Sequence, residues 1–274
     1  MSAFVRLQKV LPQHALSRLA GRLAAAQNRW VRQRLIRAFA RAYDIDMTQA
    51  ERSDLADYHS FNDFFSRALV PGARPIDPAP GAIVSPADGA VSQTGRIEDG
   101  HLIQAKGIRY SFEALADAAA SPAFEGGAFA TIYLSPSDYH RVHLPVAGRL
   151  VQTVAIPGRL FSVNATTEAG VEGLFAVNER LVMAFETDLG RMLVVMVGAM
   201  IVASIETVWD GPASPYRTKV VTAYDLPFDR GAEIGRFLLG SSVVLAFENA
   251  RADLREDLAA GVVVRMGERI GGAA

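Results

Sequence analysis

The sequence contains no cysteine, few lysines and no long apolar run. The absence of cysteine excludes disulfides, thiolate metal sites, iron–sulfur clusters and cysteine nucleophiles. Pyridoxal enzymes and biotin or lipoate carriers need one special lysine. None of the three lysines, Lys9, Lys106 and Lys219, lies in an obvious attachment hairpin, although Lys106 beside Gly107 stays open. The longest apolar run, residues 192–203, is too short for a helix that spans a bilayer and predicts a buried strand pair.

Three common catalytic motifs are also missing. There is no phosphate-binding Gly-x-x-x-x-Gly-Lys loop, no Gly-x-Gly-x-x-Gly after a strand and no His-Glu-x-x-His. The chain has 274 residues, of which 50% are hydrophobic and 21% are charged. That composition predicts a folded protein with a sizeable core, built as one large domain or as one domain with an appendage.

Acidic residues are absent from positions 1–43, which carry nine basic residues and a formal charge of +9. The rest of the chain has 19 basic and 29 acidic residues, a charge of −10. A basic arm on an acidic body indicates an anionic partner for the arm. Nucleic acid is disfavoured because no basic strand with interleaved aromatics follows, and we therefore expect an anionic membrane surface. Arg18 and Arg22 interrupt the apolar stretch of a secretory signal, and a mitochondrial transit peptide is a minor alternative.

Apolar residues in the arm recur at helical spacing. Leu16, Leu19 and Leu23 form one stripe, and a second runs from Val31 to Ala42. With basic side chains on another face and Trp30 between the stripes, this composition is typical of a helix lying on anionic lipid. The alternative is a helix that packs on a core and keeps a solvated arginine face. We expect residues 1–60 to form a basic, amphipathic helical segment for membrane association.

Beyond the arm the pattern changes. Residues 44–70 still look helical, and Pro and Gly at 71–75 end that pattern. Short β-branched runs separated by Gly and Pro then predict an α+β fold with a mainly antiparallel β body, similar to a barrel or sandwich hybrid. We expect helices at residues 110–120 and 252–260. The expected strands include residues 82–84, 131–134, 193–197, 201–208, 242–247 and 262–264.

Two histidines lie in the segment Ser135-Pro-Ser-Asp-Tyr-His-Arg-Val-His143. Ser135 followed by Pro136 is a favourable helix start, and a helical turn would place His140 and His143 on one face. Two histidines at this spacing can bind a metal, but no third ligand is near in sequence, and we expect no metal. A packed polar turn is the structural alternative. The pair, with a tyrosine and an aspartate, favours a catalytic role.

A Gly240-Ser241-Ser242 triplet separates two apolar runs. It can be an ordinary turn between strands. It can also hold a strained peptide bond, because glycine permits backbone angles closed to other residues. The serine hydroxyl could then attack the preceding carbonyl, given a base and a group that stabilises the oxyanion. The resulting ester can eliminate to dehydroalanine, which loses ammonia and becomes a pyruvoyl group. Such a ketone would serve as the electron sink that pyridoxal provides elsewhere.

Together these residues resemble the phosphatidylserine decarboxylase proenzyme family, in its longer, membrane-associated bacterial branch. The resemblance covers about residue 61 to the C-terminus. Ser242 and Val70 depart from the residues that the family commonly has there, Thr and Lys, and neither change should affect the chemistry. The segments that carry the resemblance are Phe61–Leu69, Gly72–Ile76, Val84–Gly89, Tyr139–His143 and Phe237–Ser242.

The resemblance implies a role for each matching residue. Asp88 orients His143, which acts as the base, and Ser241 is the nucleophile of self-cleavage at Gly240–Ser241. Ser241 becomes the pyruvoyl cofactor and forms a Schiff base with the amine of phosphatidylserine. His140 acts in decarboxylation to phosphatidylethanolamine and CO2, as proton donor. A β chain, residues 1–240, and an α chain, residues 241–274, stay associated, and residues 61–274 form the catalytic domain.

We also expect peripheral attachment to the cytoplasmic side of the cell membrane. Two alternatives stay open at this point. One is a serine hydrolase with an Asp88, His143 and Ser241 triad, although Ser241 lacks the Gly-x-Ser-x-Gly elbow. The other is a membrane-docking module without catalytic activity, in which the histidine turn is only structural.

Overall fold

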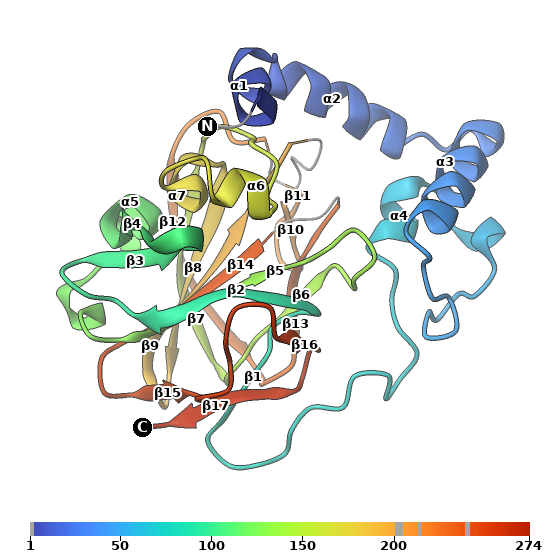
Figure 1. The fold of residues 1–274 in the computed structure, drawn as a ribbon. Helices are drawn as coiled ribbons and strands as arrows, with labels where there is room; N and C mark the ends of the chain where they lie inside the picture. Colours follow the sequence, from blue (N-terminus) through green and yellow to red (C-terminus); the bar gives the residue numbers. More distant parts are fainter. Residues whose placement is uncertain (1–2, 201–204, 213–214, 239–241) are drawn as a thin grey trace.

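The computed structural model describes residues 3–200, 205–212, 215–238 and 242–274. It confirms an α+β protein, in which helices near the N-terminus lie along one side of a β-rich body (Figure 1). All pairings between the named strands are antiparallel. The predicted class and the mainly antiparallel body are therefore correct.

The body is built on one large sheet of eight strands in the order β12-β7-β8-β9-β14-β5-β2-β16. β9 and β14, near its middle, are buried on both faces, which explains why residues 192–197, the first part of the longest apolar run, have no polar alternation. The strands of this sheet are β2 (Gly89–Arg96), β5 (Ala128–Tyr133), β7 (Gly148–Ile156), β8 (Arg180–Thr187), β9 (Gly190–Val197), β12 (Val220–Phe228), β14 (Ser242–Phe247) and β16 (Val263–Val264).

Different structures cover the two faces of the large sheet. On one face, Val142, Ile205 and Phe237 from a four-stranded sheet pack with Met183 and Met196 of the large sheet. The four-stranded sheet has the order β11-β10-β13-β6. On the other face, side chains of short helices and of the β3-β4 hairpin form a second core. The strands and helices concerned are β6 (Arg141–His143), β10 (Ile205–Thr207), β11 (Gly211–Pro212), β13 (Glu233–Phe237), β3 (His101–Gln104), β4 (Ile108–Ser111), α5 (Phe112–Ala116) and α7 (Leu174–Val177). A further short helix, α6 (Ala165–Glu168), precedes α7 in the chain.

The expected barrel-like closure is not found among the described strands. β12 and β16 are the two edges of the large sheet and do not pair with each other. A third sheet, in the order β1-β17-β15, completes the body. Burial of the large sheet is thus achieved by layers on both faces rather than by closure on itself. The third sheet consists of β1 (Ala82–Val84), β15 (Ala252–Leu254) and β17 (Arg269–Ala273).

The arm is helical, as predicted, with α1 (Ala3–Val10), α2 (Gln13–Ala24) and α3 (Arg29–Ala42). Two buried glutamines attach it to the body. The Gln8 amide donates to Ser162 Oγ at 3.0 Å and accepts from Ser162 N, and Gln13 accepts from Leu160 N at 3.0 Å. No helix in the described part of the chain is both long and apolar enough to cross a bilayer.

Two helix predictions in the body need correction. Residues 44–70 contain only a short 3-10 helix, Leu55–Asp57, and α4 (Phe61–Phe65). The expected helix at 252–260 is absent, because residues 252–254 pair with β17 as β15. Leu254 and Leu258 have helical spacing, but both pack on the core from an extended strand and a turn. The helix expected at 110–120 is confirmed in shorter form, as α5 and a 3-10 turn.

Candidate active site

The histidine segment forms a tight turn followed by a strand, so the predicted helical turn is wrong. The Ser135 amide donates to the Asp138 carboxylate at 2.6 Å, and the Asp138 amide donates to Ser135 O. β6 then begins at Arg141 and pairs with β13. His140 therefore precedes the strand and His143 ends it. Burial raises the pKa of the Asp138 carboxyl, although its hydrogen bonds from Ser135 oppose the shift.

His140 is completely buried and has one unoccupied ring nitrogen. Its Nδ1 lies 2.8 Å from the Asp138 carbonyl. Because a carbonyl only accepts, Nδ1 carries the proton, and Nε2 of the neutral ring has a free lone pair. Among the described residues Nε2 has no hydrogen-bond partner. Burial lowers the pKa of His140 to about 3, so the ring is neutral near pH 7. It can donate a proton from Nε2 only after accepting one there.

His143 is also buried, but both of its ring nitrogens are occupied. Nδ1 lies 2.8 Å from the Gly231 carbonyl, and the Tyr139 hydroxyl lies 3.0 Å from Nε2. The carbonyl fixes the proton on Nδ1, so Tyr139 donates to Nε2. Burial lowers the pKa of His143, although the Gly231 hydrogen bond and the charge of Glu233 oppose the shift. His143 is therefore a neutral imidazole with a tyrosine on its accepting nitrogen.

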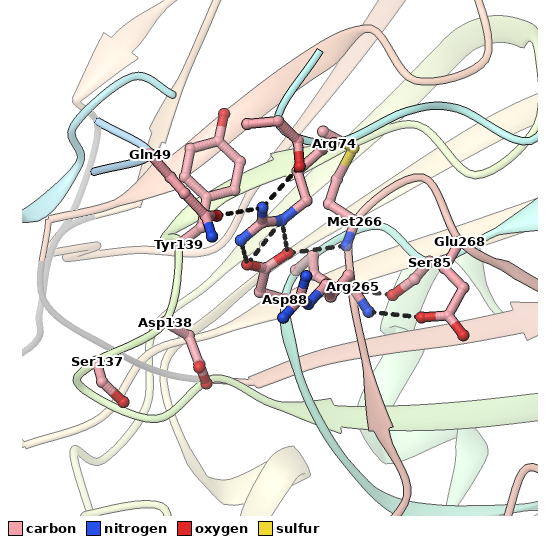
Figure 2. Close-up of polar contacts among 12 residues, drawn as sticks. Gln49, Arg74, Ser85, Asp88, Ser137, Asp138, Tyr139, Arg265, Met266 and Glu268 are labelled. Carbon is pink, nitrogen blue, oxygen red and sulfur yellow. Dashed lines mark hydrogen bonds and ion pairs between the residues drawn. The ribbon is translucent and has the colours of Figure 1, made fainter. Parts of the chain in front are cut away.

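Asp88 does not hydrogen bond to His143. Its carboxylate receives a fork from Arg74, with Nε 2.8 Å from Oδ1 and 3.0 Å from Oδ2 and with Nη2 also bonded. The Met266 amide adds a hydrogen bond of 2.9 Å. Figure 2 shows the Arg74 guanidinium between this carboxylate and the side chain of Gln49, which accepts from Nη1 at 2.7 Å.

The expected Asp88–His143 hydrogen bond is therefore replaced by two separate contacts. A guanidinium matches the two oxygens of a carboxylate better than one imidazole N–H does. The Nδ1 of His143, in turn, already donates to the Gly231 carbonyl. In this structure Asp88 acts on His143 through its charge, which works to raise the histidine pKa.

Gly240 and Ser241 lie outside the described residues, but the strands on both sides of them are placed. β13 ends at Phe237, whose amide donates to the His140 carbonyl at 2.9 Å. β14 begins at Ser242, which lies opposite Tyr133 of β5. Tyr133 is two positions before the turn that carries Asp138. The chain before the predicted cleavage site thus contacts the histidine segment at His140, and the chain after it pairs with Tyr133, close to the start of that segment.

The sequence did not point to several polar residues of this region. Arg74 belongs to a segment that carries the resemblance, yet no role was assigned to it. Arg67 and Tyr139 likewise lie within quoted segments and contact the histidine turn or His143. A lone arginine has no sequence signal that identifies its partner, so only the fold could show these contacts. No group of three His, Asp or Glu side chains within the described ranges could hold a metal ion.

Comparison with known proteins identifies the family. A family model described as phosphatidylserine decarboxylase matches residues 61–272, and one described as PSD matches residues 3–44. A phosphatidylserine decarboxylase proenzyme of Pseudomonas fluorescens is 51% identical over 277 residues, which cover 98% of this chain and 96% of the relative. One from Azotobacter vinelandii is 52% identical over 279 residues, 98% of each chain. The chain therefore belongs to the phosphatidylserine decarboxylase family.

Proposed function

We propose that this phosphatidylserine decarboxylase cuts itself between Gly240 and Ser241 and uses a pyruvoyl group made from Ser241 to convert phosphatidylserine to phosphatidylethanolamine and CO2. Three features support this proposal together. β13 ends at the His140 carbonyl, β14 begins opposite Tyr133, and the neutral His140 has no partner for Nε2 among the described residues. The curated relatives are named proenzymes, which agrees with processing of the chain.

Self-cleavage follows from the chemistry of the serine hydroxyl. Ser241 Oγ attacks the Gly240 carbonyl carbon, the C–N bond breaks, and the amine and an ester remain. Loss of the Ser241 α-proton expels the Gly240 carboxylate and leaves dehydroalanine. Its enamine form isomerises to an imine, and water replaces the nitrogen to release ammonia and leave a ketone. All atoms come from the chain and one water molecule.

His143 is the proposed base for the first step. Its Nε2 accepts from the Tyr139 hydroxyl, so a proton lost by Ser241 can reach His143 through Tyr139. Asp88 supports the protonated imidazole through its charge, and Arg74 holds that carboxylate in place. A serine hydrolase triad would instead need Asp88 on the imidazole, where the structure has Gly231.

The site also fits the ketone and the reaction that it supports. His140 Nε2 and Ser242 Oγ are buried polar atoms without a partner in the described structure, and both belong to segments that adjoin the proposed cleavage site. When present, the pyruvoyl group withdraws electrons from the carbon that loses CO2. His140, neutral at the start, accepts a proton from the substrate ammonium at Nε2. It then returns a proton to the carbon that has lost CO2, which keeps the predicted role as proton donor.

The arm supplies the membrane contact in this proposal. The helices turn polar residues toward the body: Gln8, Gln13 and Ser17 are buried. Several large apolar side chains face outward, and Leu19, Leu23 and Trp30 are 57%, 49% and 79% exposed. In α2 this arrangement is the reverse of a helix that packs on a core, whereas α1 and α3 also bury Val5 and Ile36. The nine basic residues of the arm complement an anionic surface. We propose peripheral attachment at the cytoplasmic face of the cell membrane, with phosphatidylserine as substrate.

Release of CO2 from phosphatidylserine vesicles tests the proposed reaction. The purified protein should convert the lipid to phosphatidylethanolamine, and Ser241→Ala should abolish the conversion because it cannot form the ketone. Ser53→Ala, which removes the hydroxyl of an exposed serine, is the matched control and should be cut and remain active. Equal conversion by the native protein and Ser241→Ala would refute the proposal.

A further inference from the structure

Arg67 is a buried cation without an anionic partner among the described residues. It follows α4 closely, and its side chain is almost enclosed, with a residue exposure of 4%. Its Nη2 donates to the Ser137 carbonyl at 3.2 Å, and its guanidinium lies 5.6 Å from the centre of the Phe64 ring. Nε and Nη1 are buried and have no hydrogen-bond partner in the same part of the chain.

Such an arrangement is costly for the folded protein. Arginine keeps its charge under almost all conditions and cannot relieve burial by losing a proton. Buried charges are otherwise paired, and buried N–H groups are nearly always hydrogen bonded. Burial lowers the pKa of Arg67, and the nearby charges of Asp88 and Asp138 act on it without contact. Two unused donors on a fixed cation therefore indicate a place for an external anion.

The position of Arg67 connects it to the reaction site. Ser137, which accepts from Arg67, is in the turn that carries Asp138 and precedes His140. Phe65, two residues before Arg67, lies against the His140 ring with 3.9 Å between ring centres. The guanidinium and the imidazole are thus held by the same turn and the same helix.

We propose that Arg67 binds the phosphodiester of phosphatidylserine in the mature enzyme, an inference that rests on the proposed function. The substrate has two anionic groups. Its carboxylate loses its charge as CO2 leaves, so a cation on it would stabilise the ground state more than the transition state. The phosphodiester stays charged in substrate and product. A charge-assisted hydrogen bond there provides affinity without opposing the chemical step.

Processing explains how an enclosed cation becomes accessible. In the uncut chain Nε and Nη1 of Arg67, which have no hydrogen-bond partner in the described ranges, are closed to solvent. β13 ends at Phe237, on the carbonyl of His140, and β14 begins at Ser242. Cutting between residues 240 and 241 removes the covalent link between these two strands, whose described ends contact His140 and Tyr133 on either side of the turn that accepts from Arg67. The phosphodiester therefore binds in the cut enzyme.

Kinetics of the mature enzyme with a short-chain phosphatidylserine, kept below its micelle concentration, test this inference without a membrane. Arg67→Gln should raise KM at least about tenfold, equivalent to about 1.4 kcal/mol, and leave kcat within about threefold. Short-chain phosphatidylethanolamine has the phosphodiester but no carboxylate. Its inhibition constant should rise in parallel with KM. Arg67→Lys should give a smaller rise, and Arg109→Gln, at an exposed arginine paired with Asp99, should change neither value.

Complete cutting and an unchanged melting temperature show that a variant is folded. If Arg67→Gln fails this check, KM and the inhibition constant of Arg67→Lys are used instead, because this variant keeps the charge and alters the geometry. A rise in KM with an unchanged inhibition constant would place Arg67 on the carboxylate and overturn the inference. Unchanged values for both ligands would overturn it as well. Absence of CO2 release by the native enzyme would instead contradict the proposed function.

Discussion

At the scale of single residues, the two histidines differ in what they bind. His140 and His143 both donate from Nδ1 to a backbone carbonyl. Nε2 of His143 accepts from Tyr139, whereas Nε2 of His140 has no partner in the described structure. Nε2 is therefore hydrogen bonded in His143 and available to a substrate in His140. This difference supports separate roles, with His143 in cutting and His140 in decarboxylation.

Substitution of each histidine should separate the two steps. His143→Ala removes the proposed base and should leave mostly uncut chain. Asp88→Asn should also slow cutting, because it removes the charge that supports the protonated imidazole. His140→Ala should be cut yet release CO2 at least about a hundredfold more slowly, the usual contribution of a general acid or base. Gel electrophoresis and CO2 release measure the two steps. Wild-type activity of His140→Ala would show that the division is wrong.

Stability against pH gives a second test at this scale. The pKa of His140 is about 3 in the folded protein and about 6.5 in an unfolded chain. Between these values the unfolded state binds a proton that the folded state does not, so His140 destabilises the fold as pH falls from about 6.5 toward 3. The free energy of unfolding should drop by up to about 1.4 kcal/mol per pH unit from this group alone.

Urea unfolding at pH 7 and pH 5 measures this effect. His140→Gln in the uncut Ser241→Ala protein lacks the titrating ring, so its stability should fall less on acidification than that of Ser241→Ala alone. Because only the difference between the two proteins is compared, other titrating groups cancel. Equal losses in both proteins would mean that His140 is not held neutral.

At the scale of elements, the spacing of apolar residues predicts helices well where the structure depends on contacts between residues close in sequence. Helical spacing predicts two stripes in the arm, which α2 and α3 confirm, and α1 precedes them without a predicted stripe. The same rule failed at Leu254 and Leu258, because pairing of residues 252–254 with β17 outweighs local preference there. β10 and β13 bring Ile205 against Phe237, a pairing that no sequence period encodes.

In the site, too, the sequence identifies the segments but not the contacts between residues far apart in the chain. The segments with Asp88, His140 and His143 were recognised from the sequence, and the fold places all three in the body. The separate partners of Asp88 and His143 were not predictable from the sequence: Arg74 binds the carboxylate, and the Gly231 carbonyl accepts from the imidazole. Both partners are backbone or lone charged groups without a motif of their own.

Two glycines test how closely the elements fit. A Cβ at Gly89, the first residue of β2, would lie 2.3 Å from Tyr133 O, so Gly89→Ala must displace the β2–β5 pairing next to Asp88. We expect a loss of about 1–3 kcal/mol in the free energy of unfolding.

Gly21 in α2 has nothing within 4 Å of its Cβ position. Gly21→Ala should therefore add about 0.5–1 kcal/mol. Urea unfolding of both variants measures the two changes in the free energy of unfolding. Equal changes would contradict the packing described for these glycines.

At the scale of the whole molecule, the arm combines basic charge, unopposed by acidic residues before Asp44, with many exposed apolar side chains. In Figure 1 the helices α1 to α3 lie along one side of the β body, and α3 contacts α4 near the histidine turn. Phe39 of α3 packs edge-on against Phe65, which in turn lies on His140. A membrane-bound arm would therefore be in direct contact with the elements that hold the reaction site.

Membrane binding should depend on the outward leucines of α2. Leu19→Glu with Leu23→Glu removes two apolar contacts and adds two charges that anionic lipid repels. Each leucine that enters an apolar environment contributes about 1.5–3 kcal/mol, so co-sedimentation with phosphatidylserine vesicles should weaken at least about tenfold. Val263→Glu, at a 72% exposed position on β16, is the control and should bind normally. Unchanged binding of the leucine variant would reject the arm as the docking surface.

The central claim is that the chain makes its own electrophile from Ser241, and the intact mass of the purified protein tests it most directly. The account predicts two chains, residues 1–240 and a 34-residue chain from 241 to 274. The small chain should begin with a ketone, which reacts with hydroxylamine, and should lack a free α-amine. An active protein of full length, or a small chain that begins with an unmodified serine, would contradict the account.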